Sequence, residues 1–157
     1  MYKIFFLILI VIAQAFPQQG RLIPNPLKNI PRWARTEFKN HRLDKNYTIT
    51  FRYYPHYYKG DFNNDKRNDI ALQIINNESG KSGIVIIHGK KPQTISTSYT
   101  ILGAGKAVDK AGDDFKWADR WLFNDTNNRD EIILISNRSR KGKFTWNGST
   151  YEWQAFK

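Results

Sequence analysis

The fold of this chain is decided by residues 69–88, which read DIALQIINNESGKSGIVIIH. Residues 69–75 and 82–88 are apolar runs rich in β-branched side chains, a composition that favours strands. The polar residues 76–81 between them are typical of a tight turn. The stretch therefore predicts a β-hairpin. The unbroken apolar run of residues 84–87 indicates that its second strand lies in the middle of a sheet.

Further strands are expected on both sides of this hairpin, from the same pattern of β-branched and aromatic residues. They cover residues 47–54, 94–102, 131–136, 143–146 and 151–154. The last two flank Asn147-Gly148, a pair that tolerates positive φ and therefore predicts a second hairpin. We expect a mainly β protein, with α+β as the alternative, built on an antiparallel sheet of about five to seven strands.

One or two short helices are expected to pack on this sheet. Apolar residues recur at helical spacing over residues 31–40, where a proline is acceptable in the first turn. A second short helix is expected over residues 113–123, because Asp113 is suited to cap it and Trp117 and Trp121 lie four residues apart. The glycine-rich residues 103–112 are expected to be flexible.

The chain begins with the three-part pattern of an export signal. A short basic start precedes an apolar run, and residues 13–15, Ala-Gln-Ala, have the small-x-small pattern of a signal-peptidase site. We expect residues 1–15 to be a removed signal peptide, residues 16–30 an extended Pro-rich lead-in, and residues 31–157 a single β-rich domain. The mature protein would be periplasmic or extracellular, with no stable membrane span. A retained anchor is the alternative for the first segment.

The composition limits the chemistry and favours anionic partners. The 157 residues include no cysteine, which excludes disulfides, thiolate metal sites and cysteine nucleophiles. A formal net charge of +11 favours an anionic glycan, an envelope component or an acidic protein as partner. Nucleic acid is possible but not favoured. The alternative is that the charge only keeps the surface solvated.

Residues 60–69 place oxygen-bearing side chains at every second position, immediately before a predicted strand. Alternate residues of a tightly turned loop point towards a common centre, and calcium takes about 6 to 8 oxygen ligands from carboxylates, amides and carbonyls. The candidate calcium ligands are the side chains of Asp61, Asn63, Asp65 and Asp69 and the backbone carbonyl of Arg67. The alternative is a turn that binds no metal, because Asp and Asn side chains also hydrogen-bond to their own backbone.

The sequence from Gly60 to Leu72 resembles the calcium loop of FG-GAP and VCBS repeats, found in integrin-like propellers and in many exported bacterial proteins. The resemblance implies a calcium site between two strands, with ligands at loop positions one, three, five, seven and nine. These positions carry the five candidate ligands. Position twelve is Leu72 and not the bidentate Glu of an EF-hand, so a helix-loop-helix calcium sensor is excluded.

The loop departs from the family pattern at its sixth position, where such loops usually carry glycine and this chain has Lys66. A non-glycine residue in left-handed backbone costs about 1 kcal/mol. Three carboxylates among neighbouring cations predict a weak site, with a Kd of about 0.1 to 1 mM. At about 1 mM free calcium the ion would add roughly 0.4 to 1.4 kcal/mol of stability.

Small exported bacterial proteins of unassigned role that carry one such loop also resemble this chain at residues 80–84, 101–105 and 113–117. Residues 123–134 repeat the loop-then-strand order with degraded ligands. Two such units cannot close a propeller, which needs at least about four blades, so a small sheet domain is expected. The five tryptophans suit either core packing, which is favoured, or a stacking surface for sugars or bases.

The function favoured by these patterns is that of an exported, non-enzymatic, calcium-stabilised module whose basic surface binds an anionic or protein partner. The three histidines form no HxH or HExxH motif. The alternative is a secreted hydrolase of phosphate esters or glycans, with its site at the metal or at His88, Asp113 and Asp114. A further alternative is an inhibitor or immunity protein that blocks an acidic enzyme cleft.

Overall fold

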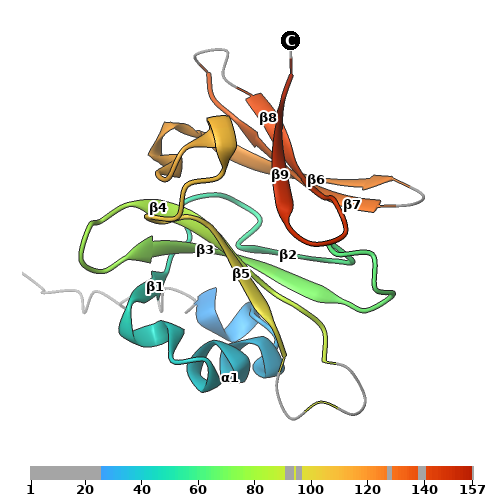
Figure 1. Cartoon of the computed structure of the whole chain (residues 1–157). Helices are drawn as coiled ribbons and strands as arrows, with labels where there is room; N and C mark the ends of the chain where they lie inside the picture. Colours follow the sequence, from blue (N-terminus) through green and yellow to red (C-terminus); the bar gives the residue numbers. More distant parts are fainter. Residues whose placement is uncertain (1–25, 91–93, 95–96, 127–128, 138–140, 157) are drawn as a thin grey trace, which may run out of the picture.

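The computed structural model describes residues 26–90, 94, 97–126, 129–137 and 141–156. The protein is mainly β, as expected, but its strands form two antiparallel sheets instead of one (Figure 1). The first sheet contains β1 (Tyr47–Ile49), β2 (Tyr57–Gly60), β3 (Asp69–Asn76), β4 (Ser82–Ile87) and β5 (Tyr99–Gly103). The second sheet contains β6 (Arg120–Thr126), β7 (Arg129–Ile135), β8 (Lys141–Trp146) and β9 (Tyr151–Ala155).

The hairpin predicted from residues 69–88 is confirmed as β3 and β4, whose register runs from Ile70 opposite Ile87 to Ile75 opposite Ser82. β4 lies between β3 and β5, which also confirms its central position. Both β1 and β2 pair with the other edge of β3. The strand expected over residues 47–54 therefore ends at Ile49, and the chain rejoins the sheet only at β2, which the sequence did not predict.

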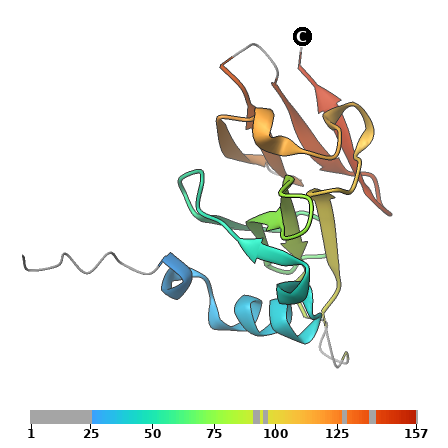
Figure 2. The same cartoon turned by 90° about the vertical axis from the view of Figure 1, so that its left-hand side faces the viewer.

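The first sheet is covered on both faces, so the molecule has three layers (Figure 2). On one face lies the helix α1 (Arg32–Asn40), which confirms the helix expected over residues 31–40. Its residues Ala34 and Phe38 are buried one turn apart against Leu72 and Val85 and their neighbours in the first sheet. The opposite face packs against the second sheet, which explains why apolar residues fill β3 and β4 without alternation.

The described end of the lead-in is not extended. Pro26–Asn29 forms a 3₁₀ helix, η1, and Ile30 is buried under the first sheet beside α1. The expected signal peptide over residues 1–15 lies outside the described residues, as does most of the lead-in. Among the residues that the structure describes, no helix is both long and apolar enough to cross a membrane.

The core between the two sheets is rich in aromatic side chains. Trp121, Phe144 and Trp153 of the second sheet pack there with Ile84 and Ile86 of β4. The indole nitrogen of Trp121 donates to the Pro55 carbonyl, 2.8 Å away, in the segment between β1 and β2. The two sheets are therefore joined by aromatic burial and by polar contacts to the loops of the first sheet.

The helix expected over residues 113–123 is wrong. Only Phe115–Trp117 turns, as the 3₁₀ helix η4, and Asp114 caps it instead of Asp113. The chain then enters β6, where Trp121 is fully buried and Leu122 is exposed, the alternation of a strand. The four-residue spacing of Trp117 and Trp121 therefore reflects two separate core contacts and not one helical face.

Residues 103–112 are also different from the expected flexible segment. Ala104, Val108 and Ala111 are buried, and Asp109–Ala111 forms the 3₁₀ helix η3. Val108 and Ala111 pack with the aromatic side chains of the second sheet, whereas Ala104 packs in the cluster on the α1 side of the first sheet. A further 3₁₀ helix, η2 (Leu43–Lys45), follows α1. The hairpin predicted across Asn147-Gly148 is confirmed as β8 and β9.

Candidate metal centre

The candidate calcium loop joins β2 to β3, between Gly60 and Asp69, which face each other at the end of the strand pair. The structure thus places a strand on each side of the loop, while the calcium site that the resemblance implies between them stays a prediction. Lys66 has a φ of 67° and Asn64 a φ of 58°, so both residues are in the left-handed region. The backbone conformation expected at the sixth position is therefore present, with lysine where glycine would be free of strain.

The loop is held by hydrogen bonds from its own backbone to its acidic and amide side chains. The two carboxylate oxygens of Asp61 accept from the amides of Asp65, at 2.9 Å, and Lys66, at 2.8 Å. Asn63 Oδ1 also accepts from Asp65 N, and Asp65 Oδ1 accepts from Arg67 N, at 3.0 Å. Each oxygen keeps a second lone pair, so these bonds orient the side chains without using up their capacity as ligands.

Asp69 ties the loop to the end of β4. Its side chain is fully buried, and its two oxygens accept from Phe62 N at 3.0 Å and from Gly89 N at 2.8 Å. His88 Nδ1 lies 3.3 Å from Asp69 Oδ2, but the ring is not aligned for a hydrogen bond and this nitrogen has no such partner. The other ring nitrogen, Nε2, lies 3.3 Å from Thr100 Oγ1.

The second sheet reaches the loop through two residues that sequence reasoning missed. The first is Asp130 of β7, whose Oδ2 accepts from Asp61 N at 2.5 Å. Burial raises the pKa of Asp130; the bond from Asp61 N opposes this rise, and the nearby carboxylates of Asp125 and Asp61 add to it. Residues 123–126 and 129–134, which belong to the segment that echoes the loop in sequence, lie in the paired antiparallel strands β6 and β7.

The second residue is Tyr151 of β9. It is 4% exposed, its ring is parallel to that of His88, and its buried hydroxyl has no hydrogen-bond partner. Burial raises the pKa of Tyr151, and the negative charges of Asp69, Asp61 and Asp65 raise it further. All three carboxylates of the loop therefore act on one buried, unpaired hydroxyl.

The side chains of these residues offer the oxygen ligands that a hard cation prefers, but they do not lie close enough together in this structure to surround one. Across the described part of the chain, no three His, Cys, Asp or Glu side chains gather as a group that would hold a metal. Arg67 Nη1 also lies 3.3 Å from Asp65 Oδ2 and offers that carboxylate a competing positive charge. Calcium binding therefore requires the three carboxylates to draw together, with Asn63 and the Arg67 carbonyl as further ligands.

Of the two hydrolase sites considered from the sequence, the one formed by His88, Asp113 and Asp114 is not assembled. Asp113 pairs with Lys81, whose ammonium group lowers the pKa of that carboxyl. Asp114 accepts from Ser82 N at the start of β4, at 2.9 Å, whereas His88 follows the end of the same strand. Six residues of strand separate the two ends by about 20 Å, so neither aspartate can act with His88.

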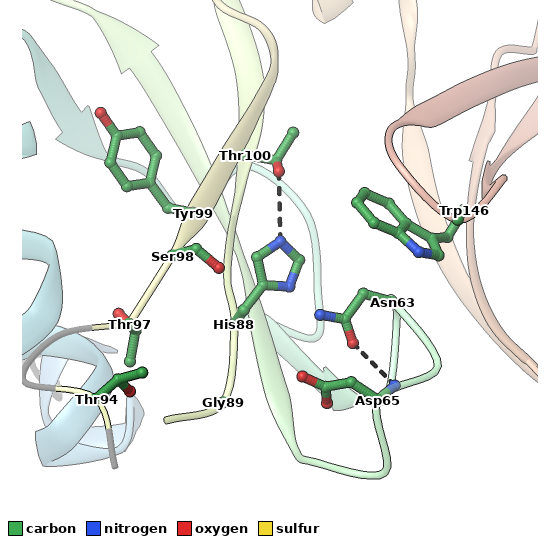
Figure 3. Close-up of a pocket in the computed structure, with 11 residues that line it drawn as sticks. Asn63, Asp65, His88, Gly89, Thr94, Thr97, Ser98, Tyr99, Thr100 and Trp146 are labelled. Atoms are coloured by element: carbon green, nitrogen blue, oxygen red, sulfur yellow. Dashed lines mark hydrogen bonds between the residues drawn. The ribbon is translucent and has the colours of Figure 1, made fainter. Parts of the chain in front are cut away.

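A pocket of about 580 Å³ opens beside the loop. Its lining includes His88, which Figure 3 shows between Asn63 and Trp146 on one side and Ser98 and Tyr99 on the other. Four hydroxyl side chains complete much of its wall: Thr94, Thr97, Ser98 and Thr100. The prediction that tryptophans serve the core thus holds for Trp121 and Trp153, while Trp146 also lines this pocket.

Comparisons with known proteins give no further information about this site. No family model matches the chain, and neither the curated proteins nor the solved structures give a significant match. The similarity of the loop to FG-GAP and VCBS repeats therefore stays a prediction from its short sequence pattern.

Proposed function

We propose that this protein is a non-enzymatic binding module, stabilised by one calcium ion in the loop of residues 61–69, with a basic surface for an anionic partner. The observation that carries the proposal is the loop geometry, in which backbone amides hold the side-chain oxygens of Asp61, Asn63 and Asp65 at the end of the β2–β3 pair. A divalent cation would neutralise the loop carboxylates where the two sheets meet. Export stays part of the proposal through the signal pattern of residues 1–15.

The ion would stabilise the contact between the two sheets. Asp61 and Asp69 belong to the loop of the first sheet, while Asp130 and Tyr151 come from the second. Drawing the loop together around calcium would fix the face that the second sheet contacts. Because Lys66 and Arg67 lie beside the carboxylates, the affinity should be weak, with a Kd of about 0.1 to 1 mM.

Calorimetric titration of the mature protein with calcium chloride tests the metal site. We expect heat of binding and a higher melting temperature than in EDTA, corresponding to roughly 0.4 to 1.4 kcal/mol at about 1 mM calcium. The double variant Asp61→Asn/Asp65→Asn should lose both effects. Asp44→Asn/Glu78→Gln removes the same charge at exposed positions and should keep them. The absence of heat and of a melting shift in the unaltered protein would end the calcium proposal.

A hydrolase is the second candidate because Asp69, His88 and Thr100 follow one another beside the pocket as carboxylate, imidazole and hydroxyl. This set replaces the one considered from the sequence. A panel of phosphate-ester and glycoside substrates, tested on the unaltered protein and on His88→Asn, separates the candidates. Turnover that disappears in the variant would favour the hydrolase, and equal background rates in both would favour the binding module.

A further inference from the structure

Two pockets meet at the candidate calcium loop and differ sharply in chemistry. The first is the hydroxyl-lined pocket of about 580 Å³, and the second has about 430 Å³. Gly89 and Thr97 line both, so the pockets adjoin. The loop divides its residues between them: Asn63 and Asp65 line the first, whereas Lys66 and Arg67 line the second. One extended ligand can therefore occupy both pockets across the loop.

The first pocket suits a ring that carries many hydroxyl groups. Trp146 offers an apolar face, and threonine and serine hydroxyls offer donors and acceptors. Tyr99 lines the pocket too, but Figure 3 shows its ring turned away from Trp146, and it packs on His41 with 4.8 Å between the ring centroids. Asn63 and Asp65 add an amide and a carboxylate. No lysine or arginine is among the described residues that line it, and Asp65 would repel an anion there. A sugar ring meets all these conditions, because it has apolar C–H faces and a rim of hydroxyls.

The second pocket suits an anionic group. Four basic side chains line it: Lys59, Lys66, Arg67 and Lys90. Its one acidic residue, Glu37, already accepts hydrogen bonds from the backbone amide and the hydroxyl of Thr97. The three lysines make no ion pair with any other residue in the described ranges, so their charge is available to a ligand. The 36% exposed Trp33 adds an apolar surface at the same place.

We propose that the partner is an acidic oligosaccharide, bound with a sugar ring in the hydroxyl-lined pocket and its acidic substituents in the basic pocket. This inference rests on the proposed binding function and names its ligand class. A nucleic acid would bring phosphate at every unit, including beside Asp65, and an acidic peptide would leave the hydroxyl-lined pocket without complementary groups. Carboxylate and sulfate substituents share the required chemistry, and the test distinguishes them.

Calcium and the oligosaccharide should bind cooperatively, because one short loop contributes to the ion site and to both pockets. Calcium would neutralise Asp65 and fix the positions of Lys66 and Arg67. A several-fold gain in oligosaccharide affinity on adding calcium is therefore expected. Because oligosaccharide binding is also measured in EDTA, the failure of one proposal can be told from the failure of the other.

The experiment is calorimetric titration of the mature protein with a hyaluronan oligosaccharide, a keratan sulfate oligosaccharide and a neutral dextran oligosaccharide, each in calcium and in EDTA. Both acidic ligands contain neutral rings between charged ones, so a neutral ring can occupy the hydroxyl-lined pocket. Single-stranded DNA and polyglutamate serve as anionic competitors. We expect at least one acidic oligosaccharide to bind and the dextran oligosaccharide to bind at least about tenfold more weakly, as the loss of two or more charge contacts implies. The preferred acidic ligand distinguishes carboxylate from sulfate.

Two variants probe the pockets separately. Lys66→Ala/Lys90→Ala in the basic pocket and Trp146→Ala in the hydroxyl-lined pocket should each weaken binding by about tenfold, since charge contacts and ring stacking are of that size. The control Lys45→Ala/Lys106→Ala removes the same charge at another pocket, near the opposite end of β3, and should change affinity less than about twofold. Near-ultraviolet circular dichroism confirms that each variant folds.

Several results would overturn the inference. The first is that neither acidic oligosaccharide binds. The second is that DNA or polyglutamate binds as tightly as the oligosaccharides. The third is that the control variant and the pocket variants lower the affinity for the oligosaccharide equally. Oligosaccharide binding in EDTA without any heat from calcium would support this inference and end the calcium proposal. Calcium binding without oligosaccharide binding would support the calcium proposal and end this inference.

Discussion

Asp130 of β7 and Asp61 of the candidate calcium loop are joined by a hydrogen bond, with 2.5 Å between Asp130 Oδ2 and Asp61 N. The bond crosses from the second sheet to the first residue of the loop. Gly60 permits this approach, because a Cβ there would lie 2.7 Å from Asp130 Oδ2 and 2.8 Å from the Phe123 ring. The loop is thus positioned by the second sheet as well as by its own turn.

Asp130→Ala should therefore destabilise the protein and weaken calcium binding. Losing the acceptor leaves the part-buried Asp61 amide unpaired, at a cost of about 1 to 3 kcal/mol. Asp130→Asn keeps an oxygen acceptor and should lose less. Urea unfolding in EDTA measures the stability, and calcium titration measures the affinity. Equal stability of the alanine variant and the unaltered protein would show that Asp130 does not hold the loop.

The sequence predicted the elements whose signals are local. The β3–β4 hairpin and the Asn147-Gly148 hairpin were recognised because strand composition and turn residues lie side by side in the chain. The left-handed backbone at Lys66 was implied by the resemblance of the loop to FG-GAP and VCBS repeats, which usually carry glycine there. β6 was missed because Trp117 and Trp121 imitate a helical spacing, whereas their burial is imposed by separate contacts in the core.

The site could be predicted only in part, for the same reason. The five candidate ligands occupy one short loop, and their mutual hydrogen bonds are local. Asp130 and Tyr151 come from strands that no pattern links to that loop, and they meet it only because the second sheet folds onto the first. The division of the loop between two pockets likewise depends on β5 and α1, which lie elsewhere in the chain.

Lys66→Gly should stabilise the protein by about 1 kcal/mol, because glycine adopts the φ of 67° without strain. Lys66→Ala removes the same charge but keeps the strained backbone, so it should show no such gain. Both variants should bind calcium more tightly, since each removes a cation beside the carboxylates. Thermal melts in EDTA and calcium titrations of the pair therefore separate backbone strain from charge. A glycine variant no more stable than the alanine variant would contradict the strain argument.

Tyr151→Phe should leave stability in EDTA unchanged or raise it by up to about 1 kcal/mol. The hydroxyl it removes is buried and has no hydrogen-bond partner in the structure, so its loss relieves a desolvation cost. Tyr151→Ala is the contrasting variant, because losing a buried ring costs about 3 to 5 kcal/mol. Urea denaturation measures both. If Tyr151→Phe lowers the free energy of unfolding by more than about 1 kcal/mol, the hydroxyl has a hydrogen-bond partner.

Gln73→Ala should be strongly destabilising. The Gln73 side chain is buried in β3, donates to the Tyr53 carbonyl at 3.0 Å and accepts from the Tyr53 amide at 2.8 Å. It thus replaces the strand partner that Tyr53 lacks in the segment between β1 and β2. Leaving both backbone groups unpaired should cost about 3 kcal/mol. Asn77→Ala is the control, because it removes an exposed amide that hydrogen-bonds to Thr48 and Lys45. An equally large loss of stability in that variant would contradict the argument that burial makes Gln73 important.

Glu37→Gln should lower stability at neutral pH but not in acid. The Glu37 side chain is 12% exposed. Burial acts to raise the pKa of Glu37, but hydrogen bonds from Thr97 and Asn40 and the nearby His41 outweigh it, so the pKa is lowered. Folding therefore favours the ionised carboxylate. The resulting stability is present above the ordinary pKa of 4.5 and is lost as the pH falls through the lowered value.

At pH 7 the glutamine variant should be about 1 kcal/mol less stable than the unaltered protein, because it weakens the charged hydrogen bonds that hold Thr97. The difference should shrink towards zero as the pH falls below 4.5 and through the lowered pKa of Glu37, because the carboxylate in the unaltered protein then becomes protonated. Urea unfolding of both proteins across this range gives the curve, with the exposed Glu78→Gln as a control. A difference that stays constant or widens in acid would show that the ionised Glu37 does not stabilise α1 against the segment that carries Thr97.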